Sequence, residues 1–337
     1  MGGPVPDNLN EPKRAARRAL ADYIGVKPGP SGSRVWVFTD QGRRWFADCL
    51  AEAALELRCR AWVTCLAGDF FSAEDLGPVK RMLALLGPDD VVVSAFSDYS
   101  MGRIPFSAVF PNFRSPEGFR GKSAAIRAHY PDDALVQHLL TPPDSVDAVA
   151  ARYLALSNAG RVRVTSGGGT DFECEIGKAI LLPYKVGSGE RHAFLPPAEV
   201  AFGITAGTAR GLLIADITAS DIVIGGKTVA RLGLVDEPIR VEMSEGRISS
   251  ISGGRTAETL RDWLERLGPE SRLAVELGFG LSEGVPTGSG SADECLQGTF
   301  HVGFGDDSFF NKLNKAPVHL DLICRGPRVT RIAVPRL

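Results

Sequence analysis

The pattern of secondary-structure signals changes near Gly160, and this change limits the possible folds more than any other feature of the sequence. Before it, stretches with helical periodicity separate short apolar segments at residues 34–39, 61–66, 90–95 and 106–110. After it, short apolar runs alternate with glycine-containing turns. Apolar strands separated by helices predict a parallel sheet covered on both faces. We therefore expect an α/β N-terminal domain at residues 1–159 and an α+β metal-binding catalytic domain at residues 160–337.

Helices and turns follow from the remaining patterns. Helical periodicity predicts helices at residues 12–23, 43–57, 75–86, 118–140 (with a break at Pro131), 146–158 and 257–267. Alternation around Glu245-Gly246 predicts a hairpin at residues 242–252. The glycines at 167–169 fall between two expected strands rather than before a helix, which argues against a phosphate-binding loop.

Composition excludes several classes of protein. A length of 337 residues favours two domains, and a net charge of −2 without a basic run argues against a nucleic-acid partner. No apolar run reaches the ~18 residues of a membrane span, and no secretory leader is recognisable, so we expect a cytoplasmic protein without a membrane partner. The six cysteines form no C-x-x-C pair and are expected to be buried free thiols.

The candidate chemistry lies in the C-terminal half. His319 and Asp321 belong to the apolar run VHLDLI, and alternate residues of a strand point to the same face. They form either a chelating pair or a hydrogen bond that satisfies a buried imidazole. His301 lies among glycines in GTFHVGFG and is either a ligand or a core histidine.

Isolated acids occur in two further apolar segments. Glu276 lies in RLAVELGFG, and Glu199 lies in FLPPAEVAF. A buried carboxylate must be paired or must bind a cation, so a salt bridge with an arginine is the alternative for Glu276. Imidazoles and carboxylates are ligands of zinc, manganese, cobalt and ferrous iron. Three carboxylates with two histidines suit two metal ions that share a bridging ligand.

Four ordered blocks, LPPAEV, VELGFG, DECLQGTFHVGFG and VHLDLI, resemble the M29 metallopeptidases, the aminopeptidase T family. The resemblance covers residues 161–324. It implies that metal is bound by Glu199, Glu276, His301, His319 and Asp321. It also implies self-association, with a dimer as the expected state, and a two-metal hydrolysis in which activated water attacks an amide bond.

The same superfamily contains ferrous dioxygenases that cleave dihydroxypyridine rings. This branch is similar to the chain in length and keeps the H-x-D pair, but it places a histidine at the position of Glu276 and lacks equivalents of Glu199 and His301. The peptidases carry a tyrosine a few residues after the histidine that corresponds to His301. At that place this chain has Ser308 followed by two phenylalanines.

Five further residues are candidates for supporting roles. His192 is a proton shuttle or a surface-loop histidine, and Asp171 contacts substrate or caps a turn. Ser308 is a second candidate for substrate contact. Asp293 and Glu294 are expected either to orient the His301 imidazole by hydrogen bonding or to be solvated loop acids.

The ligand count favours a metal-dependent, aminopeptidase-like hydrolase of a small peptide or peptide-like metabolite, with zinc, manganese or cobalt. One alternative is a mononuclear iron(II) ring-cleaving dioxygenase of a hydroxylated heteroaromatic compound. The other is a metal-binding protein without catalytic activity.

Overall fold

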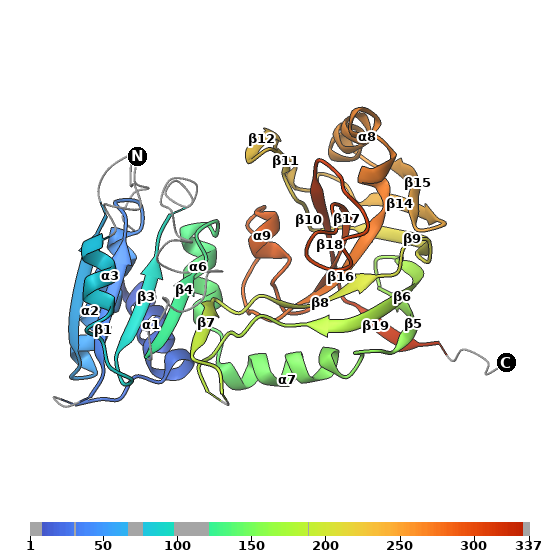
Figure 1. The fold of residues 1–337 in the computed structure, drawn as a ribbon. Coiled ribbons are helices and arrows are strands. Elements are labelled where there is room, and N and C mark those ends of the chain that lie inside the picture. Colours follow the sequence, from blue (N-terminus) through green and yellow to red (C-terminus); the bar gives the residue numbers. More distant parts are fainter. Residues whose placement is uncertain (1–8, 30–31, 67–76, 98–120, 188, 333–337) are drawn as a thin grey trace. The chain divides into compact units, whose positions relative to one another are not determined.

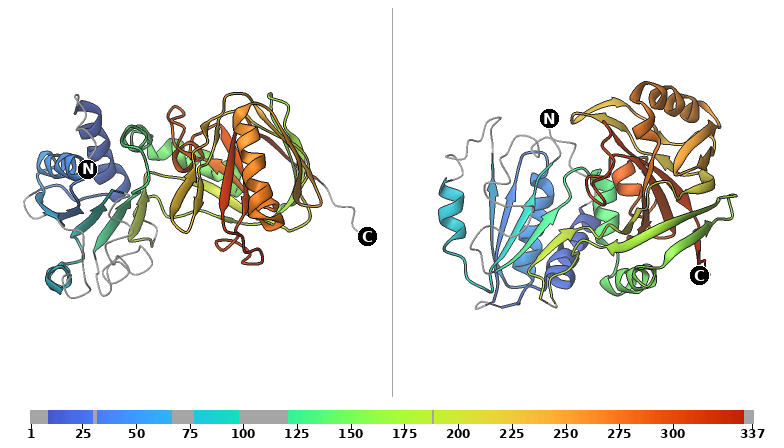
Figure 2. Two further views of the ribbon diagram at one scale, coloured as in Figure 1. Left: turned by 90° about the horizontal axis from the view of Figure 1, so that it is seen from above. Right: turned by 45° about the vertical axis from the view of Figure 1, so that its right-hand side comes forward.

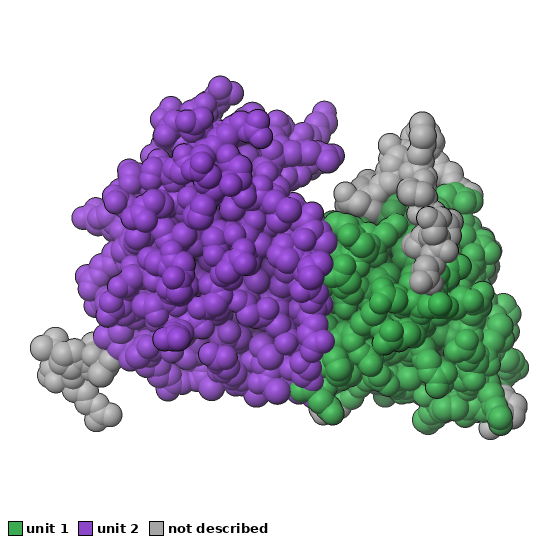
Figure 3. All heavy atoms as spheres, turned by 180° about the vertical axis from the view of Figure 1, so that it is seen from behind, with its two compact units in different colours: residues 1–144, 182–197 green, residues 145–181, 198–337 purple. Residues whose placement is uncertain are grey.

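The computed structural model describes residues 9–29, 32–66, 77–97, 121–187 and 189–332. The chain forms two compact units (Figure 3). Unit 1 comprises residues 1–144 and 182–197, and unit 2 comprises residues 145–181 and 198–337. This division differs from the single boundary expected near residue 159. The chain enters unit 2 earlier, and it returns once to unit 1 because residues 182–197 supply that unit's last strand.

Unit 1 contains a five-stranded parallel sheet in the order β2-β1-β3-β4-β7 (Figure 1). Its strands are β1 (Arg34–Thr39), β2 (Arg60–Cys65), β3 (Val91–Ala95), β4 (Lys122–Ile126) and β7 (His192–Leu195). Every residue of β3 is buried, as expected of a central parallel strand. The parallel sheet expected from the sequence is therefore present in the described residues.

Helices accompany this sheet. They are α1 (Asn10–Arg18), a π-helical turn η1 (Ala19–Ile24), α2 (Arg44–Glu56), α3 (Gly77–Leu83) and α6 (Asp132–Leu139). The apolar side of α2 packs on β1 and β2, while α1 packs on α2 and α6. The helix expected at residues 118–140 is wrong in its first part, where β4 extends the sheet beside β3. The strand expected at residues 106–110 lies outside the described residues.

Unit 2 is built on a large sheet whose named strands all pair antiparallel. Its path runs β13-β10-β18-β17-β16-β8-β6-β9-β14-β15, and β5 joins β6 to β19. The strands are β5 (Gly160–Thr165), β6 (Asp171–Ile180), β8 (Glu199–Ile204), β9 (Arg210–Ala215), β10 (Thr218–Ala219), β13 (Gly233–Leu234), β14 (Ile239–Ser244), β15 (Arg247–Ser252), β16 (Ala274–Gly280), β17 (Thr299–Gly305), β18 (His319–Arg325) and β19 (Arg328–Arg331). A separate hairpin consists of β11 (Ile222–Ile224) and β12 (Lys227–Ala230).

Short helical elements complete unit 2. They are α7 (Pro143–Leu154), which begins at the unit boundary, α8 (Arg255–Leu267), the 3₁₀ turn η3 (Pro269–Arg272) and α9 (Gly290–Asp293). Figure 2 shows α8 lying along the curved sheet, where it packs on β14 and β15. The expected hairpin at residues 242–252 and the helix near residues 257–267 are confirmed. Within the described residues, no helix is both long and apolar enough to cross a membrane.

The central strands of unit 2 divide their residues between an apolar face and a glycine-rich face. In β16, Leu277 and Phe279 are fully buried, and the Phe279 ring stacks on Tyr153 with centroids 4.1 Å apart. The alternate positions of the same strand are Glu276, Gly278 and Gly280. Because side chains alternate along a strand, the apolar residues pack into the core on one face of the sheet. The opposite face is left for the candidate ligands.

Candidate metal centre

Four neighbouring strands carry the five candidate ligands. The strands lie in the order β18-β17-β16-β8, so residues far apart in sequence become cross-strand neighbours. Glu276 pairs with Gly303, and Gly303 pairs with Asp321. Since directly paired residues point to the same face, Glu276 and Asp321 project together across a glycine.

Two glycines make space for the ligand side chains. A Cβ atom on Gly278 would lie 2.1 Å from His301 Cε1 and 2.5 Å from Glu199 Oε2. A Cβ atom on Gly303 would lie 2.9 Å from both Asp321 Oδ1 and His319 Nε2. Any other residue at either position would therefore occupy the space that the ligands use.

The five side chains form one continuous cluster. His301 Nε2 lies 3.0 Å from Glu199 Oε2 and 3.5 Å from Glu276 Oε1. His319 Nε2 lies 3.0 Å from Glu276 Oε2 and 3.2 Å from Asp321 Oδ1. Glu276 thus contacts both imidazoles. The alternative of a salt bridge between Glu276 and an arginine is not observed among the described residues.

Three overlapping groups have ligand atoms within 4.8 Å of one another: Glu199, Glu276 and His301; Glu276, His319 and Asp321; and Glu294, His301 and Asp321. The third group includes Glu294, which the sequence suggested either to orient His301 or to be a solvated loop acid. Glu294 directly follows α9, and that short helix brings its carboxylate towards the β17–β18 pair.

Hydrogen bonding fixes the orientation of His319. Its Nδ1 lies 2.8 Å from the carbonyl oxygen of Asp306, so Nδ1 carries the proton and donates it. The other ring nitrogen, Nε2, faces the carboxylates of Glu276 and Asp321. A backbone carbonyl behind a histidine commonly selects the tautomer that binds metal.

The charges in the cluster favour a cation. Burial would lower the pKa of His301 and His319, yet the neighbouring carboxylates raise the pKa of both well above the usual value. Burial would raise the pKa of Glu276, but hydrogen bonds from the two histidines hold it at about 2. Burial raises the pKa of Glu199, and burial with the charge of Asp321 raises that of Glu294.

The donor atoms also fit a metal ion. Glu199 Oε2 and Asp321 Oδ1 are shielded from solvent and accept no well-directed hydrogen bond from the described residues. The cavity of about 330 Å³ around them is lined by acids, histidines, Ser308 and Phe309, without a lysine or arginine among its described lining residues. Oxygen and imidazole donors without a basic partner match the preferences of divalent transition metals.

The supporting residues have different outcomes. Ser308 lines the cavity and donates a hydrogen bond to the Asp306 carboxylate. Asp293 is buried and accepts hydrogen bonds from Thr218 and from Thr287, so it fixes the 287–293 loop rather than His301. The Asp293 carboxylate therefore holds the 287–293 loop in place.

Two other candidates lie elsewhere. Asp171 is exposed at the start of β6 and pairs with Arg163, and it is not among the residues that line the cavity. His192 begins β7 in unit 1, is buried, and shares a hydrogen bond with the Ser123 hydroxyl at 2.9 Å. The expectation that His192 lies in a surface loop is wrong, because the segment becomes an edge strand beside β4.

Asp306 and Phe309 also line the cavity and were not expected from the sequence. Both lie in the loop after β17, and an irregular loop has no periodicity that reveals which way its side chains point. Their closeness in sequence to Ser308 was the only available signal.

Comparisons with known proteins identify related chains. A curated relative from Pseudomonas putida, a 2,5-dihydroxypyridine 5,6-dioxygenase, is 28% identical over 209 residues, or 58% of this chain. The match spans 57% of the length of that relative. The solved structure of 2,5-dihydroxypyridine dioxygenase from Pseudomonas putida KT2440 is 19% identical, with a TM-score of 0.61 over 97% of this chain and 95% of that one.

A second solved structure, wild-type AmpT from Thermus thermophilus, shares the fold. It has a TM-score of 0.56 and 17% identity over 95% of this chain and 94% of that one. The fold of this chain is therefore shared with both solved structures.

The expectation of an aminopeptidase-like hydrolase is wrong. It rested on the number of ligand-type side chains. The curated relative is a dioxygenase, and so are the proteins of the family whose sequence model matches this chain. A ligand count is a poor guide here because Glu276, His301 and Asp321 are each shared between overlapping groups. The family model of NicX, 2,5-dihydroxypyridine 5,6-dioxygenase, matches residues 125–330, which include every candidate ligand. Since this match covers more than half of the 337 residues, the chain belongs to the 2,5-dihydroxypyridine 5,6-dioxygenase family.

Proposed function

We propose that this protein is a ring-cleaving dioxygenase that acts on a hydroxylated nitrogen heteroaromatic compound. The observation that carries the proposal is the cluster of Glu276, His319 and Asp321, which lies within the segment that matches the dioxygenase family. The curated relative is named for 2,5-dihydroxypyridine, and this compound is the first substrate to test.

Glu276, His319 and Asp321 would hold one ferrous ion. Their ligand atoms come from two strands on either side of β17, and Gly303 lies between them. The three donors approach from the sheet, so the opposite side of the site faces the cavity. Ferrous iron bound there would supply redox chemistry towards dioxygen and a Lewis-acidic centre for a ring hydroxyl. Two carboxylates and one imidazole replace the more usual two histidines and one carboxylate.

The cavity suits one small aromatic ring. Its volume is about 330 Å³, and Phe309, which is 60% exposed, presents an apolar face beside the polar cluster. A planar ring can stack on this side chain while its hydroxyls point to the acids. The Ser308 hydroxyl donates to Asp306, so its oxygen lone pairs can accept a hydrogen bond from substrate.

Glu199 and His301 would handle protons. Glu199 Oε2 and His301 Nε2 are 3.0 Å apart, so a small rotation of either side chain would align them for proton transfer. Neither residue belongs to the proposed iron triad, although the ligand atoms of both lie within 4.8 Å of a Glu276 carboxylate oxygen. The pair would therefore receive the proton that a ring hydroxyl loses on binding.

The test combines metal analysis with oxygen uptake. Protein purified without oxygen and loaded with ferrous iron should bind about one iron per chain, and it should consume dioxygen when 2,5-dihydroxypyridine is added. Asp321→Asn should abolish iron binding and oxygen uptake, whereas Glu237→Gln, an exposed acid of the same unit, should leave both unchanged. Oxygen uptake that is equal in wild type and Asp321→Asn would contradict the proposed site. An iron-loaded protein that turns over no hydroxylated pyridine would contradict the proposed activity.

A further inference from the structure

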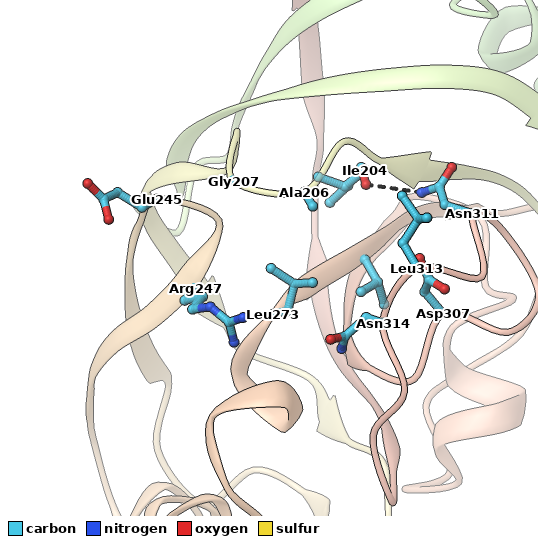
Figure 4. Close-up of a pocket in the computed structure, with 11 residues that line it drawn as sticks. Ile204, Ala206, Gly207, Glu245, Arg247, Leu273, Asp307, Asn311, Leu313 and Asn314 are labelled. Atoms are coloured by element: carbon cyan, nitrogen blue, oxygen red, sulfur yellow. Dashed lines mark hydrogen bonds between the residues drawn. The ribbon is translucent and has the colours of Figure 1, made fainter.

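A second cavity lies in unit 2 beside the metal centre. It has a volume of about 420 Å³ and is bounded by the β8–β9 turn, the β14–β15 hairpin, the start of β16 and residues 307–314 (Figure 4). Figure 4 shows Asp307, Leu313 and Asn314 on one side of this cavity and Glu245 and Arg247 on the other. None of the proposed iron ligands lines it.

Asp307 is a buried acid that forms no ion pair within the described ranges of the chain. The residue is 3% exposed, and its Oδ1 has no hydrogen-bond partner among the described residues. Its backbone is well anchored, because its carbonyl accepts hydrogen bonds from the amides of Phe310 and Lys312. An unpaired buried carboxylate is costly, so its position next to a cavity indicates that a ligand supplies the positive charge.

The surrounding polar groups also favour a donor-rich ligand. The Asn314 side-chain nitrogen already donates to the carbonyls of Gly305 and Glu270, at 2.6 and 2.9 Å, so its oxygen remains as an acceptor. Arg247 lines the same cavity, but its guanidinium donates to the carbonyl of Pro269, and no ion pair joins it to Asp307 in the described part of the chain. The lining contains the acids Asp307 and Glu245 against this one tethered cation.

Apolar side chains make up the rest of the lining. They include Ile204, Leu273 and Val275, together with Leu313, whose side chain is 79% exposed. A bare metal ion would require several more oxygen ligands and would gain nothing from this apolar surface. We infer that the second cavity binds a small organic ammonium compound, with the cation on Asp307 and the alkyl part on Leu273, Val275 and Leu313.

The same loop lines both cavities. Asp306, Ser308 and Phe309 face the metal pocket, whereas Asp307 and Asn311 face the second cavity. Asn311 also donates to the carbonyl of Ile204 at 3.3 Å, which ties the loop to β8. A ligand that shifts Asp307 would therefore shift its two neighbours, so binding at one cavity should change affinity at the other.

Binding can be measured with a simple probe. n-Butylammonium is titrated into metal-free protein by isothermal calorimetry, with n-butanol and n-butyrate as controls of equal chain length. We expect saturable binding of the ammonium alone, and at least a tenfold loss of affinity in Asp307→Asn. Asp262→Asn, an exposed acid on α8, serves as the matched control and should bind like wild type.

Several results would overturn the inference. Equal affinity of Asp307→Asn and wild type would remove Asp307 from the site, and equal binding of butanol and butylammonium would remove the charge requirement even if the variant failed to fold. Tight binding of Ca²⁺ that excludes butylammonium would show an inorganic cation site instead. The coupling is tested by repeating the titration with metal-loaded protein, and equal affinities would overturn it. The metal-free titration does not depend on the proposed dioxygenase activity, so the two proposals fail separately.

Discussion

Glu276 contacts both imidazoles of the metal cluster, with Oε1 3.5 Å from His301 and Oε2 3.0 Å from His319. Its carboxylate is buried, and the two histidines hold its pKa at about 2 against the effect of burial. This residue therefore stays ionised across the physiological range. Within the family resemblance, the dioxygenase branch has a histidine at this position, which makes the side chain a sharp test of the proposed ligand set.

Substitution of Glu276 should separate charge from ligation. Glu276→Gln keeps the shape but removes the anionic ligand, and we expect the affinity for ferrous iron to fall at least about 100-fold. Glu276→His restores two histidines and one carboxylate, the usual ferrous set, and should retain iron. Anaerobic metal titration provides the measurement, with Glu237→Gln as the control. Iron affinity that survives in Glu276→Gln would rule out ligation by this residue.

At the scale of the element, β16 and β17 combine an apolar face with a face of glycines. Leu277 and Phe279 pack into the core of unit 2, while Gly278 and Gly303 leave room for ligand side chains. The glycines weaken the strands intrinsically, because they add no packing. The neighbouring apolar residues and the antiparallel partners on both sides of each strand offset this loss.

A single methyl group should therefore disrupt the site. The new Cβ of Gly278→Ala would lie 2.1 Å from His301 Cε1, so we expect loss of iron binding and destabilisation by about 1–3 kcal/mol. Gly177→Ala is a matched control in β6, since nothing lies within 4 Å of its added Cβ. Metal titration and urea unfolding report the two effects. Normal iron binding by Gly278→Ala would mean that the ligands do not need this space.

At the scale of the whole molecule, the free energy of unfolding should depend on pH through His138, a buried histidine outside the metal cluster. His138 on α6 is 1% exposed and meets Tyr130 edge-on, with ring centroids 5.3 Å apart. Burial, with a smaller contribution from Arg127, lowers the pKa of His138 to about 4. In the unfolded chain, His138 binds a proton below pH ~6.5. In the folded chain, it is protonated only below about pH 4.

Folding stability should therefore fall as the pH decreases through this window. Between about pH 7 and about pH 4.5, His138 should account for a loss of about 2 kcal/mol in the free energy of unfolding. His138→Leu should remove this part of the pH dependence, whereas the exposed His129→Leu should keep it. Urea unfolding at the two pH values gives the comparison. Equal slopes for wild type and His138→Leu would contradict the burial of a neutral imidazole.

Much of the candidate site was visible in the sequence by itself. The change of pattern near Gly160, the H-x-D spacing, and the acids in apolar segments all follow from residue type and strand periodicity. These signals are local, because a strand fixes which face each residue occupies. They were sufficient to select Glu199, Glu276, His301, His319 and Asp321, and the structure brings all five together. Their role as metal ligands remains a prediction.

Only the tertiary structure decided the remaining features. The strand order β18-β17-β16-β8 determines which carboxylate meets which imidazole, and no local pattern encodes strand order. The return of residues 182–197 to unit 1 places His192 on a strand there, because the parallel sheet gains an edge beside β4. Likewise, Asp307 and Ser308 are neighbours in sequence but line different cavities. Sequence thus determined the chemical types and the faces, while long-range pairing determined which of them share one space.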